Sequence, residues 1–447
     1  MSEIAEKTDQ RQVARQILSF SWPVFISMIF TELYNITNSL IVGNYVSLKA
    51  LSAVSACTWI TNIFNYSFYG LGMGAGILIA RYYGAKDHKK LKQALDSAIV
   101  FAFAGGIILT LCSETLLPLI MKISNIGPDI YADALRYLRV YLLGNTAVLT
   151  YQMCFFILRS FGDTRHQLYY SIVSSIANML FGLLFVRVFH LDVIGTAMAT
   201  IISQFIMDVL ALRLMFRHDD FDFSFKDIDF SFRVVGEICA LGIPAGFQNM
   251  LIALSSMMVQ SHINTFENEV IAGIGVAEKI IGWGQLPSVS ISSATMALVA
   301  QNIGAENYEK VRAVIKESLK LSLVASVVLV GLIVAFAPLL VSRFNSDPGV
   351  RYYGTRMIYF SFYGPIIIVF SHIYNAACRA AGNVRIPMYI AIFSQVICKY
   401  AFVHFGLKLI YDVHILYMGT AIGYSMAGLL ASLYFLRSRW TLEHGLR

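Results

Sequence analysis

The chain has 447 residues, of which 57% are hydrophobic and 14% are charged, and its formal net charge is +7. Soluble proteins carry about 25% charged residues, so this composition excludes an ordinary assembly of water-soluble domains. It indicates an integral membrane protein whose apolar helices, each about 20 residues long, cross the bilayer and satisfy their own backbone hydrogen bonds.

Twelve apolar stretches follow one another along the chain, and each is long enough to cross a bilayer as a helix. The predicted fold class is therefore an all-α polytopic membrane protein. The first fifteen residues are polar and lack the apolar core of a signal peptide, so we expect the first span to direct insertion. The predicted spans are 17–41, 52–80, 94–116, 132–156, 167–188, 193–215, 236–262, 270–299, 315–340, 353–376, 386–407 and 415–436.

The second half of the chain repeats the first at an offset of 220 residues. Residues 158–165 (LRSFGDTR) match 378–385 (CRAAGNVR), and 70–92 have a weaker copy that starts at Ser293. A period of this length indicates duplicated domains. Each copy holds six spans, an even number, so we predict parallel repeats that begin on the same side of the membrane. The expected divisions are a tail at 1–15, an N-lobe at 16–216, a linker at 217–233, a C-lobe at 234–440 and a tail at 441–447.

Lysine and arginine are distributed unevenly between the two sides of the predicted membrane. The segments on the side of the N-terminus hold 22 of them and the segments on the opposite side hold 6, leaving out those inside or beside spans. Positive charge marks the cytoplasmic side, so we expect a multi-pass protein of the cytoplasmic (inner) membrane with both termini in the cytoplasm. Topology then explains the net positive charge, and no nucleic-acid partner is expected.

The sequence contains no pattern typical of ATP-driven transport or of hydrolytic catalysis. The P-loop GxxxxGK[ST] and the motifs GxSxG and HExxH are absent. Six cysteines and nine histidines are dispersed, which predicts neither a disulfide framework nor a metal site. We therefore expect no enzyme, no cofactor and no metal. Alternate glycines at 70, 72, 74 and 76 lie inside an apolar span and predict close helix packing rather than a dinucleotide loop.

Four stretches, in this order, resemble the multidrug and toxic compound extrusion (MATE) family of secondary transporters: 33–43 (LYNITNSLIVG), 70–92, 195–200 (GTAMAT) and 242–310. The resemblance covers nearly the whole chain and implies two six-helix lobes that form a V around a central cavity. It also implies an antiporter that exports small organic, often cationic, compounds by alternating access, coupled to the entry of protons or sodium. The expected partners are these substrates and membrane lipid, and we expect a monomer.

The residues that carry ion coupling in the family are only partly kept in this chain. Many members have aspartates at the positions of Asn38 and Gly182, whereas Asn178 and Thr200 match the family's other polar positions. Glu32 lies about 22 Å into the first span at 1.5 Å per residue, near the middle of the membrane. Ionisable residues at that depth usually face a cavity or a partner. We predict cation or proton coupling at Glu32, Asn38, Asn178 and Thr200.

Polar residues inside apolar spans are also candidates for a substrate cavity. Thr31 and Asn35 share a sector of about 120° of the first span with Glu32, and hydrogen bonding between helices is the alternative role of this polar stripe. The C-lobe candidates are Gln248, Asn249, Glu278 and Lys279. Separate ion pairs with other helices are the alternative for the two charged residues.

Prolines inside two apolar spans of the second half predict helix bends. Pro287 and Pro365 lie where the first half has Ser67 and Asn145. Proline removes a backbone donor and kinks a helix, so we expect the bends to be concentrated in the C-lobe.

Two other functions stay open at this point. A lipid-linked saccharide flippase would share the two-lobe architecture, but it needs a strongly cationic cavity for pyrophosphate, and the chief candidate cations are Lys279 and Lys399. A membrane-embedded enzyme that acts on lipid needs clustered catalytic residues at the interface, and the sequence contains no such cluster.

Overall fold

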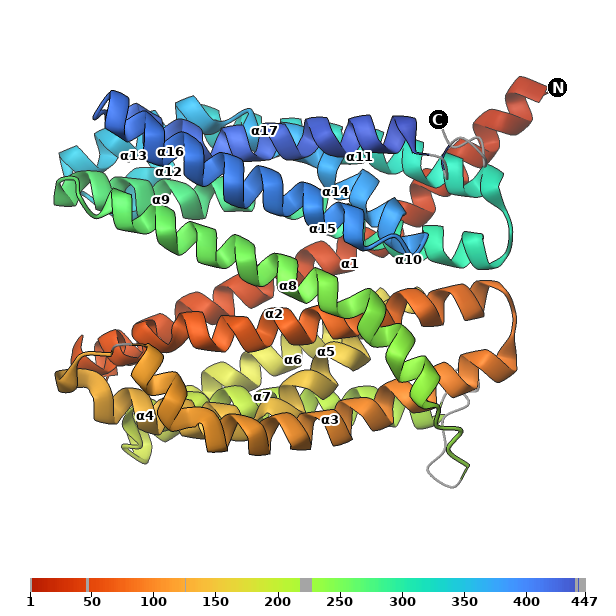
Figure 1. Ribbon diagram of the computed structural model, residues 1–447, viewed down its shortest axis with the longest axis horizontal. Helices are drawn as coiled ribbons and strands as arrows, with labels where there is room; N and C mark the ends of the chain where they lie inside the picture. Colours follow the sequence, from red (N-terminus) through yellow and green to blue (C-terminus); the bar gives the residue numbers. More distant parts are fainter. Residues whose placement is uncertain (1, 46–47, 125, 218–226, 439–440, 442–447) are drawn as a thin grey trace. The chain divides into compact units, whose positions relative to one another are not determined.

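Helices make up all the regular secondary structure within the residues that this computed structural model describes, which are 2–45, 48–124, 126–217, 227–438 and 441 (Figure 1). The predicted all-α fold class is confirmed. In the first half the helices are α1 Ser2–Tyr45, α2 Leu48–Gly84, α3 His88–Ile123, α4 Pro128–Leu143, α5 Asn145–Ser160, α6 Thr164–Leu183, the π-helix η1 Leu184–Val188 and α7 Asp192–Arg217. In the second half they are α8 Phe232–Ile263, α9 Asn268–Trp283, α10 Leu286–Gly304, α11 Tyr308–Ala335, α12 Ala337–Phe344, α13 Pro348–Ser361, α14 Gly364–Ala380, α15 Arg385–Ala391, the π-helix η2 Ile392–Cys398, α16 Lys399–Leu409 and α17 Val413–Arg437.

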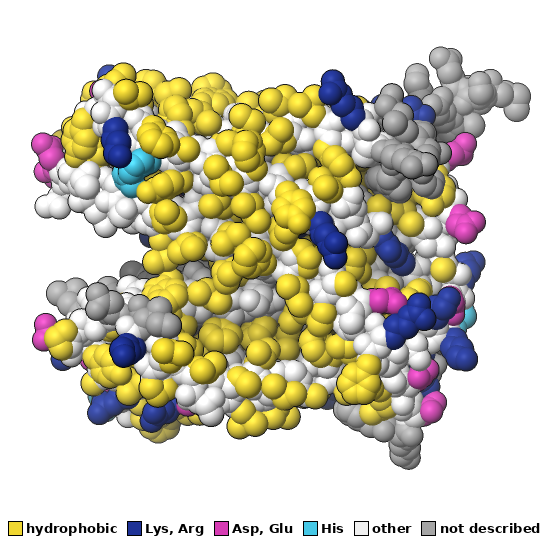
Figure 2. Space-filling model, viewed as in Figure 1, with side chains coloured by type: hydrophobic (Ala, Val, Ile, Leu, Met, Phe, Trp, Pro, Cys, Tyr) yellow, Lys and Arg dark blue, Asp and Glu magenta, His cyan; other side chains and the backbone are white. Residues whose placement is uncertain are grey.

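Each membrane span expected from the sequence has a counterpart among these helices. Within the described residues, nine helices are long and apolar enough to cross a membrane, and the bent pairs α4/α5 and α13/α14 raise the number to eleven. The stretch expected at 270–299 is divided between α9 and α10, with a break at Gly284 and Gln285, and it is not among these eleven. On the face drawn in Figure 2, hydrophobic side chains cover the middle of the helices and charged side chains gather toward their ends. The chain is therefore a multi-pass membrane protein.

The chain forms two compact units. The N-terminal unit is Pro23–Phe247, and the C-terminal unit combines Met1–Trp22 with Gln248–Arg447. The divisions fall inside α1 and α8, so each of these helices contributes residues to both units. The lobe limits expected at 216 and 234 stay a prediction.

The predicted duplication is visible in the backbone of two turns. Lys86 has a φ of 54°, and Glu306, at the corresponding position of the second half, has a φ of 56°. Gly162 and Gly382 correspond in the same way and have φ values of 84° and 86°. A positive φ is uncommon for residues that carry a Cβ, so its recurrence at Lys86 and Glu306 indicates that both halves keep the same turn.

Helix starts and helix bends also recur in the two halves. Asp87 caps α3 by accepting a hydrogen bond from the Lys90 amide at 3.1 Å, and Asn307 caps α11 by accepting one from the Lys310 amide at 3.1 Å. The pairs α4/α5 and α13/α14 are each bent by 49°. The two six-span halves are therefore repeats in structure as well as in sequence.

The expectation that the helix bends are concentrated in the second half is wrong, because both halves contain a bent helix pair. Pro365 lies in the first turn of α14, yet the equivalent bend between α4 and α5 has the same angle with Asn145 at that position. Pro287 lies in the first turn of α10, after the break that separates it from α9. The corresponding helix of the first half, α2, is continuous, so the break before Pro287 is particular to the second half. The break at Phe336 between α11 and α12 is also particular to the second half, since α3 is continuous.

The glycine run of α2 makes a close contact with α8. A Cβ added at Gly70 would lie 2.5 Å from the carbonyl oxygen of Gly242, and a Cβ added at Gly242 would lie 2.6 Å from that of Gly70. Side chains do not fit at such distances from a neighbouring backbone, so glycine is required on both helices. The packing role predicted for the glycine run is confirmed.

The linker between the halves is attached to α3 in the part that the structure describes. Lys92 Nζ lies 2.6 Å from Asp227 Oδ2 and lowers the pKa of that carboxyl group. Asp96 Oδ2 accepts a hydrogen bond from the Asp229 amide at 2.9 Å, and Ser97 Oγ accepts one from the Ser231 amide at 3.0 Å. These bonds fix the entry of the chain into α8. Residues 218–226 of the predicted linker lie outside the described residues.

Candidate functional site

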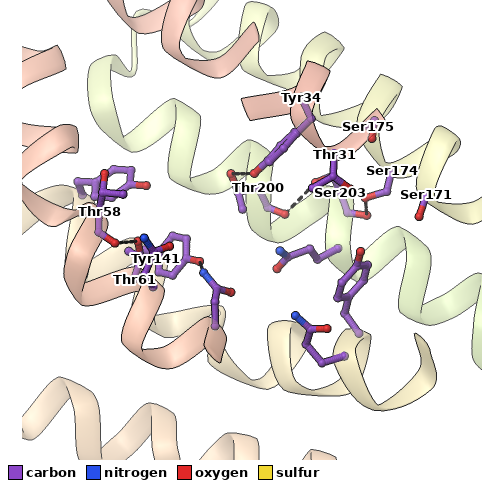
Figure 3. Close-up of a pocket in the computed structure, with 16 residues that line it drawn as sticks. Thr31, Tyr34, Thr58, Thr61, Tyr141, Ser171, Ser174, Ser175, Thr200 and Ser203 are labelled. Carbon is purple, nitrogen blue, oxygen red and sulfur yellow. Dashed lines mark hydrogen bonds between the residues drawn. The ribbon is translucent and has the colours of Figure 1, made fainter. Parts of the chain in front are cut away.

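Uncharged polar side chains enclose a cavity of about 560 Å³ within the N-terminal unit (Figure 3). They come from α1, α2, α4, α5, α6 and α7. The lining residues are Thr31, Tyr34, Thr58, Thr61, Asn62, Asn65, Tyr137, Tyr141, Tyr151, Gln152, Ser171, Ser174, Ser175, Thr200, Ser203 and Gln204. The set offers hydroxyl groups, amide groups and tyrosine rings to a ligand, and it includes no lysine, arginine or carboxylate.

Thr200 joins three helices on one wall of this cavity. Its hydroxyl oxygen lies 3.1 Å from Tyr34 Oη of α1 and accepts a hydrogen bond from Asn178 Nδ2 of α6 at 3.4 Å. Asn178 also donates to Ser203 Oγ at 3.5 Å, and Ser174 Oγ donates to the Ser203 carbonyl at 3.0 Å. Positions 200, 203 and 204 share one face of α7, because a helix has 3.6 residues per turn. The sequence of α7 thus places three polar groups on the same wall.

A second wall is formed by α2 and α4. Asn65 Nδ2 donates a hydrogen bond to Tyr141 Oη at 2.9 Å. Thr58 and Thr61 donate their hydroxyl protons to backbone carbonyls of α2, at 3.1 Å and 2.9 Å. A hydroxyl that donates within its own helix keeps its oxygen lone pairs as acceptors. This wall therefore presents acceptor oxygens to the cavity.

Two buried side-chain amide oxygens beside the cavity have no hydrogen-bond partner among the described residues. They are Oδ1 of Asn178, a residue that is 1% exposed, and Oε1 of Gln204. Leaving a buried polar atom unpaired costs about 1–3 kcal/mol. A ligand that brings a hydrogen-bond donor or a positive charge to these oxygens would recover that free energy. Three or more histidine, cysteine or carboxylate side chains do not gather into a metal-binding group in the part of the chain described here.

Three of the residues predicted to couple ions or bind substrate in the N-lobe lie at this cavity. Thr31 and Thr200 line it, and Asn178 donates to Thr200. Glu32 is exposed and is not among the lining residues. The side chains of Asn35 and Asn38 lie outside the described residues. The coupling role of this set stays a prediction.

The candidates of the predicted C-lobe all lie in the C-terminal unit. They are Gln248, Asn249, Glu278 and Lys279. Gln248 is 7% exposed and its Oε1 accepts a hydrogen bond from Arg379 Nη2 at 2.8 Å, whereas Asn249 is half-buried. The other two candidates, Glu278 and Lys279 of α9, are exposed, and Glu278 interacts electrostatically with Lys399 of α16. Their contribution to a substrate site stays a prediction.

Most of the cavity wall was not anticipated from the sequence, although a usable signal is present. In α2 the lining residues are at 58, 61, 62 and 65, and in α6 they are at 171, 174 and 175, followed by Asn178. This i, i+3, i+4, i+7 spacing places each set on one face of a helix. A polar face inside an apolar span indicates an interior wall, but it does not say which helices share the cavity.

Comparison with known proteins decides the family. The family model described as MatE matches residues 23–184 and 244–403, which together are more than half of the chain. The chain belongs to the MatE family. The predicted resemblance to MATE transporters is thereby confirmed, and the two matched segments fall in the two halves of the duplication. Members of this family are transporters rather than enzymes, so the expectation that the chain is not an enzyme is also confirmed.

Relatives that match this MatE protein over most of their length are named multidrug resistance or multidrug export proteins. It is 26% identical over 400 residues to the probable multidrug resistance protein YoeA of Bacillus subtilis (strain 168), covering 88% of this chain and 86% of YoeA. It is 23% identical over 442 residues to the multidrug export protein MepA of Staphylococcus aureus (strain NCTC 8325 / PS 47), covering 97% and 96%. A crystal structure of MATE in complex with MaL6 superposes with a TM-score of 0.90 at 20% identity, covering 96% of this chain and 97% of that one. The predicted two-lobe MATE fold is confirmed.

Proposed function

We propose that this MatE protein is a secondary active antiporter that exports small organic, cationic or amphiphilic compounds in exchange for protons or sodium. The observation that carries the proposal is the polar cavity of the N-terminal unit, lined from six helices and large enough for a small organic molecule. Tyrosine rings attract organic cations through their π faces, and four of the lining residues are tyrosines. The names of the relatives, multidrug resistance and multidrug export proteins, support the same substrate class.

The proposed setting is the cytoplasmic (inner) membrane, with the protein acting as a monomer surrounded by lipid. The excess of lysine and arginine on the side of the N-terminus supports cytoplasmic termini. Substrate would then enter the cavity from the cytoplasm or the inner leaflet and leave outward after a conformational change. Ion entry and substrate exit are coupled if each ligand favours a different one of two states.

For the coupling ion we propose Glu32 as a carboxylate that binds it at the first helix. Glu32 is adjacent to Thr31 and two positions before Tyr34, both of which line the cavity. Asn178 and Thr200 would add neutral oxygens, since Thr200 is in contact with Tyr34 of the helix that holds Glu32. The usual acidic positions hold Asn38 and Gly182 in this chain, and neither side chain is a carboxylate. Protons and sodium therefore both stay candidates for the coupling ion.

The composition of the cavity weighs against the flippase alternative. A pyrophosphate group needs several cations around it, because a buried anion is costly without opposite charges. The residues that line the described cavity include no lysine or arginine. An uncharged wall rich in tyrosine and amide groups suits a cationic or neutral ligand better.

The energy source is tested in inverted membrane vesicles that contain the protein and are washed free of ATP. Because the chain has no P-loop, these vesicles should accumulate ethidium when the lumen is made acidic or rich in sodium. Vesicles without the protein serve as the control. Ethidium accumulation that requires added ATP would reject the antiporter proposal.

A further inference from the structure

Asp208 lies on α7 behind the wall of the N-terminal cavity. It follows Thr200 and Gln204 at intervals of four residues, so all three fall on one side of the helix. Asp208 is only 4% exposed. At 1.5 Å per residue it is about 12 Å beyond Thr200, toward the end of α7 that the predicted topology places at the cytoplasm.

The surroundings of Asp208 do not offset the charge that its carboxylate would carry. Its Oδ1 atom is buried without a hydrogen-bond partner, and no ion pair joins it to a cation within the described residues. α7 packs against α2, α4, α5, α6 and η1. The titratable side chains that interact electrostatically with Asp208 are Tyr151 and Cys154 of α5, and neither type of side chain is ordinarily charged at neutral pH.

An ionised carboxylate in this position is costly, because ionisable groups inside a membrane protein need a counter-charge or several hydrogen-bond donors. A proton on the carboxyl group removes the charge and with it the cost. A cation held nearby in the cavity would also offset the charge. The proton and the cation are therefore competitors for the same negative charge.

Two cavity-lining side chains connect the cavity with Asp208. Gln204 precedes it by one helical turn, and its Oε1 atom is buried and unpaired among the described residues. Tyr151 lines the cavity from α5 and interacts electrostatically with Asp208. A cation beside Gln204 would thus lie about one helical turn, roughly 6 Å along α7, from the carboxylate.

We infer that Asp208 is a proton-binding side chain of the transport cycle, and that a cation entering the N-terminal cavity displaces its proton. The O–H bond of the carboxyl group breaks, the proton passes to water, and the remaining carboxylate balances the charge of the bound cation. No electron is transferred. This inference rests on the proposed antiporter function and adds a second carboxylate to Glu32, which is exposed whereas Asp208 is enclosed.

The test measures proton release when ethidium binds to the purified full-length protein in weakly buffered solution. The wild-type protein should release about one proton per ethidium, and its affinity should rise by up to about tenfold per pH unit where Asp208 is protonated, as linkage requires. Asp208→Asn is nearly equal in size, and its side chain cannot release a proton. It should release fewer protons per ethidium than the wild type, and its affinity should depend less steeply on pH, because Glu32 is the only one of the two carboxylates that remains. Asp208→Glu should restore proton release.

Glu114→Gln is the control, because Glu114 of α3 also has a buried, unpaired oxygen among the described residues but does not line the cavity, and its other oxygen lies 3.8 Å from Arg139 Nε. It should release protons like the wild type. Undiminished proton release by Asp208→Asn, or an equal loss in Glu114→Gln, overturns the inference. If Asp208→Asn does not fold, Asp208→Ser replaces it with the same expectation. A wild type that transports ethidium in ATP-free vesicles without releasing protons overturns this inference alone, whereas absent transport contradicts the proposed function itself.

Discussion

Gly242→Ala should destabilise the protein by about 1–3 kcal/mol, because the added methyl group has no room between α8 and α2. The new Cβ would lie 2.6 Å from the carbonyl oxygen of Gly70 and 2.7 Å from the Cα of Leu71. Both are backbone atoms, which cannot rotate away as a side chain would, so the helices must separate. The measurement is the melting temperature of the purified protein in detergent, together with the fraction recovered as a monodisperse species.

Gly236→Ala is the control for this prediction, since it makes the same chemical change on the same helix. A Cβ at Gly236 would have no atom within 4 Å outside its own helix neighbourhood, and alanine favours the helix over glycine by about 1 kcal/mol. This variant should be as stable as the parent or more stable. Equal melting temperatures for Gly242→Ala and Gly236→Ala would show that the α2–α8 contact is not as close as described.

Glu32→Gln should reduce ion-driven ethidium transport by about tenfold or more, within the range of coupling free energies between two sites. Glutamine keeps the size of the side chain and removes both its negative charge and its titration. The side chain is predicted near the middle of the membrane and follows Thr31, a residue of the cavity wall. The measurement is the initial rate of gradient-driven uptake at equal expression, with ethidium binding in detergent expected to survive.

Glu309→Gln provides the comparison, because Glu309 is exposed in the first turn of α11, outside the predicted span 315–340. Its transport rate should equal that of the parent. If Glu32→Gln also transports at the parental rate, Glu32 has only a structural role, and Asp208 is left as the N-lobe carboxylate that couples ions.

The fold was predictable because its signals are local. Apolar runs of bilayer length mark the spans, and the turn residues at 84–87 and 304–307 recur with the same backbone conformation. Pro287 predicted a bend within the span 270–299, and the structure has the break at Gly284 and Gln285, just before the proline, which lies in the first turn of α10. The pairs α4/α5 and α13/α14 are bent by the same angle, although only α14 has a proline at its start and α5 has Asn145 there. Proline is therefore not needed for this bend.

The site was only partly predictable, because a cavity depends on which helix faces meet. Thr200 and Asn178 were found through the family resemblance, and Thr31 through the polar stripe of the first span. The four lining residues of α2 went unnoticed, although their spacing marks one face of a helix. Glu32 was singled out by its position near the middle of the first predicted span, but this position does not give the direction in which the side chain points. The sequence places Asp208 inside the predicted span 193–215 as a weaker candidate, and its burial and its unpaired oxygen are seen only in the structure.

Gradient-driven uptake by the purified protein in liposomes tests the central claim most directly. The liposomes would be loaded at acidic pH or with sodium and then diluted into medium that imposes an outward gradient of one ion at a time, with a panel of cationic dyes including ethidium. We predict dye accumulation with at least one of the two gradients, and its loss when that gradient is dissipated. Uptake at the same rate with and without both gradients, or no uptake of any dye, would contradict an ion-coupled exporter.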